Sequence, residues 1–177
     1  ALEIFRESAR NAALDEDDRC SLLEAGEYNL GIALREFGSI LRHPHAKAEV
    51  NLSPEHPTLN GVPLTGKIDH LEINPDTKTI EVFDYKTSKF HPEKWNSHPS
   101  LYQYRLQLGF YKLLLNLSPT YQKYQVTKGH ILFVTPDAEA KVYDKVYEFN
   151  DEDEAELKAL IEQVYWQITS LNFVKDT

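Results

Sequence analysis

The first 42 residues show hydrophobic positions at the spacing of an α-helix. Ala, Leu, Glu and Arg are frequent in this stretch, which predicts two helices separated by the acidic run at 15–18. That run lacks the glycine and terminal glutamate of an EF-hand, so we interpret it as a turn and helix start. The second helix should end at His43-Pro44, because proline disfavours helical geometry for the residue before it. Its buried face is expected to carry four hydrophobic residues, Leu30, Leu34, Phe37 and Leu41.

From residue 46 the pattern changes to that of β-strands. The segments KAEVNL, LTGKIDHLEI and TIEVFDYKT predict three strands, and NPDTK between the last two contains the residues that a hairpin turn requires. A helix is predicted over 100–116, followed by strands at HILFVT and AKVYDKVYEF. Asn150 or Asp151 can then cap a final helix with an acidic first turn. These elements predict an α/β fold with a mixed central β-sheet flanked by helices.

Composition limits the chemistry that the chain can perform. Its single cysteine, Cys20, excludes an internal disulfide, and alone it cannot hold an iron–sulfur cluster or a structural zinc site. The net charge of −9 argues against a simple module that binds polyanions. No apolar run reaches the roughly 18 residues of a membrane span, and the first residues do not resemble a signal peptide. We therefore expect a cytoplasmic protein without a membrane partner.

The candidate chemistry lies in GKIDH at 66–70 and FDYKTSK at 83–89. Both segments belong to the predicted hairpin, so Asp69 and Asp84 can converge. Alternation along a strand puts Asp84 and Lys86 on one face and turns Tyr85 away. We expect the tips of Asp84 and Lys86 to face solvent. The helix that follows places Gln107 and Tyr111 side by side, one turn apart.

Two carboxylates and a lysine suit the hydrolysis of a phosphodiester. A divalent cation such as Mg²⁺ takes carboxylate oxygens, water and phosphate oxygens as ligands. Lys86 can orient the attacking water and offset the charge that develops in the transition state. The alternative is that Asp84 and Lys86 form an ordinary ion pair on a solvated strand, which is the more frequent role of a D-x-K tripeptide.

Taken together, these motifs resemble the RecB-like branch of the PD-(D/E)XK nuclease superfamily, found at the C-terminal end of UvrD/Rep-type helicases and in AddAB and RecBCD. The family order is a helical lead-in, a strand with Glu, G-x-x-D, D-x-K-T, and a helix with Q-x-x-x-Y. The matching positions here are Glu49, Gly66 with Asp69, Asp84 with Lys86 and Thr87, and Gln107 with Tyr111.

The resemblance implies a restriction-endonuclease-like fold and a role for each matching residue. Asp69 and Asp84 would bind Mg²⁺ or Mn²⁺ together with the Tyr85 carbonyl, and Lys86 would be the catalytic lysine. Gln107 and Tyr111 would complete the catalytic set and line the DNA path. Glu49 is a possible further site residue, and a surface position on a strand explains it equally well.

There are two departures from the family pattern. His70 replaces the arginine that often follows the second-motif aspartate, and no histidine precedes His43 to match an upstream metal ligand. We therefore expect a chain that starts inside the nuclease domain of a longer protein. The four-cysteine iron–sulfur cluster of some branches is not expected here.

The resulting hypothesis is a single nuclease domain over 1–177, with a helical lead-in at 1–45, a catalytic core at 46–149 and a C-terminal helix at 150–177. Its activity would be that of a magnesium-dependent, exonuclease-type deoxyribonuclease in DNA repair or recombination. The expected partners are DNA and a helicase motor in the same polypeptide, and a second helicase–nuclease subunit is a further candidate. The alternative is a catalytically silent domain of the same fold that guides DNA or supports the motor.

Overall fold

The computed structural model describes residues 2–97 and 100–171. Its helices are α1 (Leu2–Asn11), α2 (Glu16–Glu36), α3 (Gly38–Leu41), α4 (Leu101–Leu117) and α5 (Asp151–Thr169). The strands of the main sheet are β1 (Ala46–Asn51), β4 (Lys67–Asn74), β5 (Thr79–Lys89), β6 (Gln125–Thr135) and β7 (Tyr143–Glu148). Shorter elements are the 3₁₀ turns η1 (Ser53–Glu55) and η2 (Pro92–Ser97) and the strands β2 (Thr58–Leu59) and β3 (Val62–Pro63).

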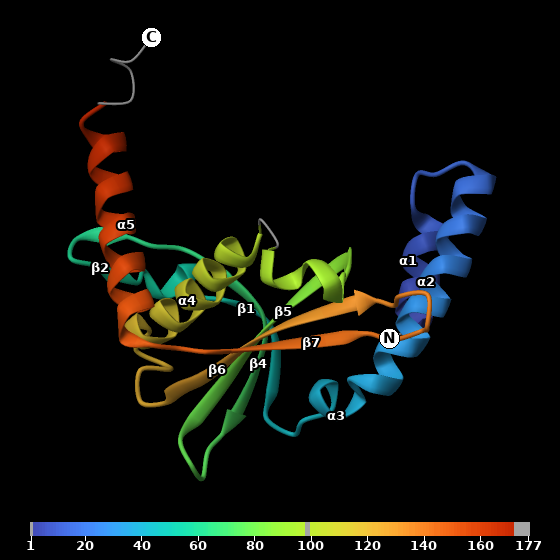
Figure 1. Ribbon diagram of the computed structural model, residues 1–177, viewed down its shortest axis with the longest axis horizontal. Helices are drawn as coiled ribbons and strands as arrows, with labels where there is room; N and C mark the ends of the chain where they lie inside the picture. The colour runs from blue at the N-terminus through green and yellow to red at the C-terminus, as the bar shows by residue number, and fades with distance from the viewer. Residues whose placement is uncertain (1, 98–99, 172–177) are drawn as a thin grey trace.

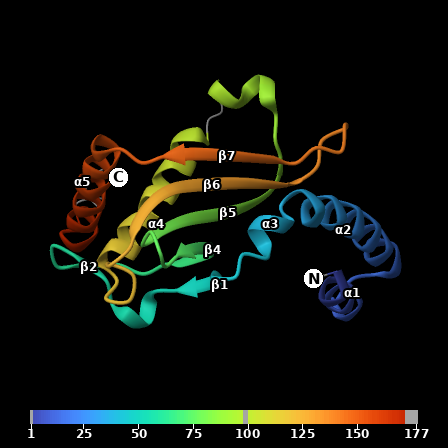
Figure 2. The same cartoon turned by 90° about the horizontal axis from the view of Figure 1, so that it is seen from below.

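The fold is α/β, with a mixed five-stranded sheet in the order β1-β4-β5-β6-β7 and helices against it. Strands β1, β4 and β5 form an antiparallel meander that includes the predicted hairpin, β5 pairs with β6 in parallel, and β7 is antiparallel to β6. Helix α4 connects the two parallel strands, as a parallel pair requires. Figures 1 and 2 show the α1–α2 pair and α5 at opposite ends of the sheet.

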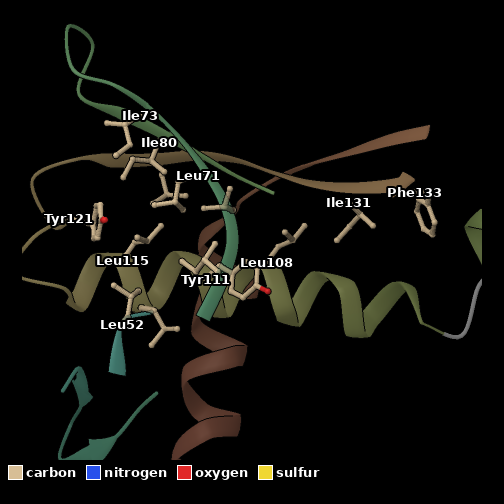
Figure 3. Close-up of a cluster of buried hydrophobic side chains, with 14 of the residues drawn as sticks. Leu52, Leu71, Ile73, Ile80, Leu108, Tyr111, Leu115, Tyr121, Ile131 and Phe133 are labelled. Atoms are coloured by element: carbon tan, nitrogen blue, oxygen red, sulfur yellow. The ribbon is translucent and has the colours of Figure 1, made fainter. Parts of the chain in front are cut away.

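The main hydrophobic core lies between α4 and the sheet, as Figure 3 shows. Leu71 and Ile80 from the sheet and Leu108 and Leu115 from α4 are each at most 1% exposed. A smaller cluster on the opposite face joins Phe37, near the end of α2, to Phe83 and Leu132 of the sheet. Because both faces of the sheet are covered, the polar side chains of its central strands are held in a water-poor environment.

Two glycines allow α4 to approach the sheet closely. A Cβ atom at Gly66 would lie 2.4 Å from Leu114 Cδ1, and one at Gly129 would lie 2.9 Å from Leu108 Cδ1. Both distances are shorter than a normal carbon–carbon contact of about 3.5 Å. The first position of the G-x-x-D motif therefore has a packing role: it sets the separation between α4 and the strand that carries Asp69.

The second helix ends earlier than predicted. Helix α2 stops at Glu36, the chain leaves helical geometry at Phe37, and the separate turn α3 follows. Arg42 Nε donates a hydrogen bond to the Gly38 carbonyl at 3.0 Å, which satisfies a backbone carbonyl of this short turn. Phe37 is buried as expected, but the prediction for Leu41 was wrong: it is 36% exposed because α3 does not continue the face of α2.

The predicted helix starts agree with the structure. Asp15 caps α2 by accepting a hydrogen bond from the Asp18 N–H, and Asn150 caps α5 through the Asp153 N–H. Of the segment expected as a C-terminal helix, residues 172–177 lie outside the described residues. No helix in the described ranges is long and apolar enough to cross a membrane.

Candidate active site

The centre of the site is formed by β5 and α4. Along β5, Ile80 and Val82 are buried in the core beneath α4, and Asp84 and Lys86 continue this face by the alternation of a strand. Gln107 and Tyr111 lie one turn apart on α4 and point to Asp84. The structure thus brings together Asp84, Lys86, Gln107 and Tyr111, and the first and last of these are 27 positions apart in the sequence.

Asp84 is held by three side chains. Its Oδ1 atom accepts hydrogen bonds from Gln107 Nε2 at 2.6 Å and from the Tyr111 hydroxyl at 3.1 Å. Lys86 Nζ lies 2.7 Å from Asp84 Oδ2 and donates to Gln107 Oε1 at 2.8 Å. Gln107 therefore contacts both charged residues and fixes the lysine relative to the aspartate.

The expectation that the tip of Asp84 faces solvent was wrong. Asp84 is only 2% exposed because Gln107 and Tyr111 cover it from α4, whereas the Lys86 side chain is 23% exposed. Burial raises the pKa of the Asp84 carboxyl above its ordinary value; Lys86 opposes this rise and the neighbouring Asp69 adds to it. Burial and the nearby Asp84 also raise the pKa of Tyr111, so its hydroxyl stays protonated and can donate.

Asp69 lies on the neighbouring strand β4 and reaches the same region. Its Oδ2 atom accepts a hydrogen bond from the backbone N–H of Tyr85 at 3.1 Å, directly beside Asp84. The Tyr85 ring turns to the opposite face, as predicted, where it contacts the ring of His70. Burial raises the pKa of Tyr85 to about 12, so this side chain is a neutral packing group.

Comparison with known proteins gives the family of the chain. The family model described as the PD-(D/E)XK nuclease superfamily matches residues 2–174. The chain belongs to the PD-(D/E)XK nuclease superfamily. No curated protein matches the chain.

Members of this superfamily are generally metal-dependent nucleases. The position of Asp84 fits a divalent cation on one structural ground: its buried Oδ2 atom has one partner among the described residues, the Lys86 ammonium at 2.7 Å, and so keeps a lone pair for a metal ion. Buried carboxylates in proteins are paired with cationic side chains or coordinate metal ions. Within residues 2–97 and 100–171, no group of three His, Cys, Asp or Glu side chains has the arrangement of a metal site, so the protein offers two carboxylates, Asp69 and Asp84.

Glu49 is not brought into this network. It lies on β1 between Ala48 and Val50, which pair with β4, but its backbone has a φ of +55° and its side chain is 63% exposed. The carboxylate forms an ion pair with Lys67 at the surface. Of the two explanations left open for Glu49, the structure favours the surface position.

Tyr104 is a neighbour of the site that we did not assign from the sequence. Lys86 Nζ lies 5.3 Å from the centre of the Tyr104 ring, within the range of a cation–π contact. The spacing in the sequence could have identified it, since Tyr104 precedes Gln107 by three residues and so shares its helix face.

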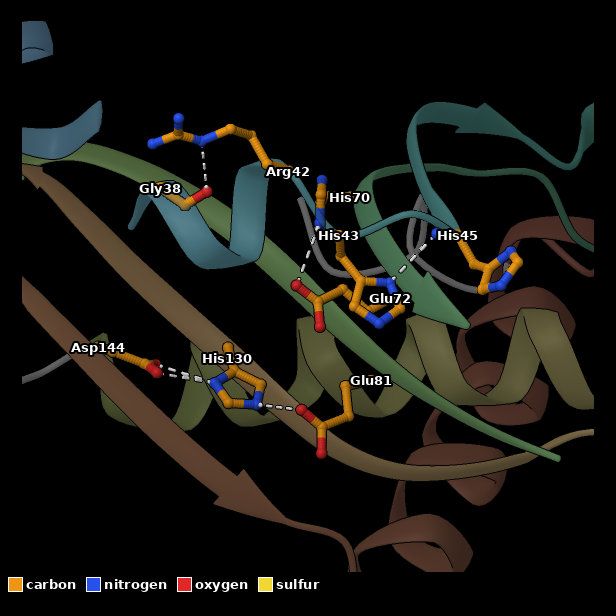
Figure 4. Close-up of polar contacts among 9 residues, drawn as sticks. All are labelled: Gly38, Arg42, His43, His45, His70, Glu72, Glu81, His130 and Asp144. Atoms are coloured by element: carbon orange, nitrogen blue, oxygen red, sulfur yellow. Dashed lines mark hydrogen bonds and ion pairs between the residues drawn. The ribbon is translucent and has the colours of Figure 1, made fainter. Parts of the chain in front are cut away.

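A second group of polar residues lies on the opposite face of the sheet (Figure 4). His130 stacks on Phe83 and lies between two carboxylates, with Nδ1 2.9 Å from Asp144 and Nε2 3.3 Å from Glu81. Glu72 is next to this group, and burial raises its pKa. Because the sheet itself separates this cluster from the face that carries Asp84, we treat the cluster as a structural network. Its residues come from three strands, so no local motif in the sequence marks it.

Proposed function

We propose that this chain is a magnesium- or manganese-dependent DNA nuclease of the RecB-like branch, with an exonuclease-type activity in DNA repair or recombination. The observation that carries the proposal is the continuous network of Asp84, Lys86, Gln107 and Tyr111, with Asp69 beside it. An ordinary surface ion pair does not need a buried aspartate with two further donors on one oxygen. The D-x-K tripeptide is therefore better explained as part of a catalytic site.

Asp69 and Asp84 would hold the cation, with the Tyr85 carbonyl as the third protein ligand. A divalent cation there would supply a Lewis acid for the phosphate and lower the pKa of a bound water. The buried Oδ2 of Asp84 supports this role because its one partner among the described residues is the Lys86 ammonium, which leaves a lone pair for a metal ion.

Lys86 would act on the substrate directly. Its ammonium group is held by Asp84 and Gln107 at the partly exposed edge of the site, where it can orient the attacking water and stabilise charge on the phosphate oxygens. Gln107 would position Lys86, and Tyr111 would position Asp84. Such fixed geometry lowers the reorganisation needed to reach the transition state.

We also propose that an attached helicase motor, with possible help from a second helicase–nuclease subunit, delivers the DNA strand. This proposal is supported by the net charge of −9, because affinity for DNA depends on the number of phosphates that cationic side chains neutralise. Tethering would supply the effective concentration that such a surface lacks.

The test is cleavage of a labelled single strand by purified variants in magnesium. Lys86→Ala and Asp84→Asn should each abolish cleavage while circular dichroism shows a folded protein. Lys123→Ala and Asp76→Asn are matched controls, since both residues are exposed and lie outside the catalytic network. Normal cleavage by Lys86→Ala would overturn the catalytic assignment, and no cleavage by the wild type would favour the silent, DNA-guiding alternative.

A further inference from the structure

A pocket of about 280 Å³ lies between η2, the first half of α4 and the strands β6 and β7. Leu108 and Ile131, each at most 2% exposed, contribute apolar surface to it. Its other walls carry Trp95, Tyr104 and Lys145. The pocket is thus apolar at its base and aromatic and cationic around it.

Two of the aromatic rings are already arranged for stacking. Trp95 and Tyr104 are stacked with an interplanar angle of 15° and ring centres 6.1 Å apart. Trp95 is further held by contacts with Phe90 and Phe133, which fix its orientation. A planar ring that enters the pocket therefore meets aromatic surface whose position is set by the core.

The charge of the pocket fits a phosphate-bearing ligand. Lys145 Nζ lies 4.5 Å from the centre of the Phe90 ring and 5.8 Å from that of Trp95, and no carboxylate in the described ranges pairs with it. Arg105 also lines the pocket, but its charge is compensated by an ion pair with Asp153. Lys145 is therefore the cation that remains available to a nucleic-acid backbone.

The pocket adjoins the catalytic residues through Tyr104. One ring thus contacts both parts, because Lys86 Nζ lies over Tyr104 and Trp95 stacks beside it. Gln107, which binds Lys86, follows Tyr104 by three residues on α4. A strand whose phosphate lies at Lys86 can therefore place a neighbouring base in the pocket.

We propose that this pocket binds one unpaired base of the strand being cut and makes the enzyme selective for single-stranded DNA. The inference rests on the proposed nuclease function and adds the substrate class. In a duplex the base is paired and stacked, and taking it out costs free energy that a single strand does not pay. Stacking on aromatic side chains is available to every base, so the selectivity would concern strandedness and not sequence.

The first test measures binding without cleavage. Fluorescence anisotropy in a chelator, at low salt, compares a dT₁₂ strand with a hairpin duplex of similar length. Trp95→Ala should weaken single-strand binding about 5- to 150-fold, the range that loss of one stacked base gives, and should leave duplex binding nearly unchanged. Trp95→Phe, which keeps a ring, should lose less. Trp166→Phe is the matched control, because Trp166 is 60% exposed on α5.

The second test locates the base. A single abasic position moved along the dT₁₂ strand should weaken binding to the wild type at one position only, and that effect should disappear in Trp95→Ala. Lys145→Gln, which spares the stacked rings, should weaken single-strand binding and reduce its salt dependence by about one phosphate contact.

These outcomes separate this inference from the proposed function. If the wild type cleaves DNA but Trp95→Ala and Lys145→Gln leave the preference for single strands unchanged, the pocket assignment is overturned and the nuclease assignment stands. If no cleavage is found but the binding effects appear, the nuclease assignment is overturned and the pocket assignment stands. Equal losses for single strand and duplex would also overturn the inference.

Discussion

Replacement of Gly66 by alanine should destabilise the protein through a single contact. The new Cβ would lie 2.4 Å from Leu114 Cδ1 and 3.4 Å from Phe110 Cε1. A normal separation is about 3.5–4.0 Å, so Leu114 or the whole of α4 must move by roughly 1 Å. Leu114 is fully buried and has little room to rotate. Overpacking of this kind costs about 1–3 kcal/mol.

The same displacement should reduce catalysis. Helix α4 carries Gln107 and Tyr111, which hold Asp84 in place. A shift of roughly 1 Å in catalytic geometry can cost up to about 100-fold in rate, so we expect Gly66→Ala to cleave more slowly than the wild type even when it is fully folded.

Urea unfolding monitored by circular dichroism measures the effect, with Gly31→Ala as the control. Gly31 lies within α2, and a Cβ there would meet nothing within 4 Å. Alanine in a helix interior is about 0.5–1 kcal/mol more favourable than glycine, so the two Gly→Ala changes should have opposite signs.

A double-mutant cycle identifies the contact itself. Leu114→Ala alone should cost about 2–5 kcal/mol because it leaves a cavity in the core. In that background Gly66→Ala should cost little, since its methyl group then enters free space. The reasoning is refuted if Gly66→Ala is as stable as the wild type, or if its cost is the same with and without Leu114.

Three further predictions concern titration, the site and DNA affinity. Burial raises the pKa of Glu72, so the folded state resists its ionisation and loses stability as the pH rises above the ordinary glutamate value of 4.5 and through the raised pKa of the folded state. Glu72→Gln should therefore raise the free energy of unfolding at pH 7 by about 1 kcal/mol, with no gain at pH 4 or in the exposed control Glu7→Gln. Tyr111→Phe removes a 3.1 Å hydrogen bond to Asp84 and should cost about 1–2 kcal/mol and lower the cleavage rate, whereas an unchanged rate would exclude a positioning role for the hydroxyl. Because Arg105 and Lys86 are already paired with carboxylates, binding of a single strand should be weak and its log–log salt slope only about −1 to −2, and a slope near −5 would contradict this account.

Much of the fold followed from local periodicity. The two-residue period of the strand that carries Asp84 placed Lys86 and Tyr85 on opposite faces. The break at Phe37 did not follow, because the hydrophobic spacing continues through a point where the backbone turns. The β2–β3 hairpin was missed although Asn60-Gly61, both with positive φ, is a typical two-residue hairpin turn.

The burial of the site residues was less predictable from the sequence than their identity. Asp84 is buried because α4 crosses above it, a tertiary contact that spacing along β5 does not contain. Likewise, the surface position of Glu49 depends on its positive φ and its ion pair with Lys67. The pocket near Trp95 combines η2, α4, β6 and β7, and no local motif joins these segments.

The central claim is that Asp69, Asp84 and Lys86 form a metal-dependent nuclease centre. Its most direct test is the release of labelled nucleotides from single-stranded DNA by the wild type, with and without magnesium, beside Asp84→Asn purified in parallel. We predict cleavage that a chelator stops and that added magnesium or manganese restores, with none from Asp84→Asn under any condition. Cleavage that persists in the chelator, or that Asp84→Asn retains at the wild-type rate, would contradict the account.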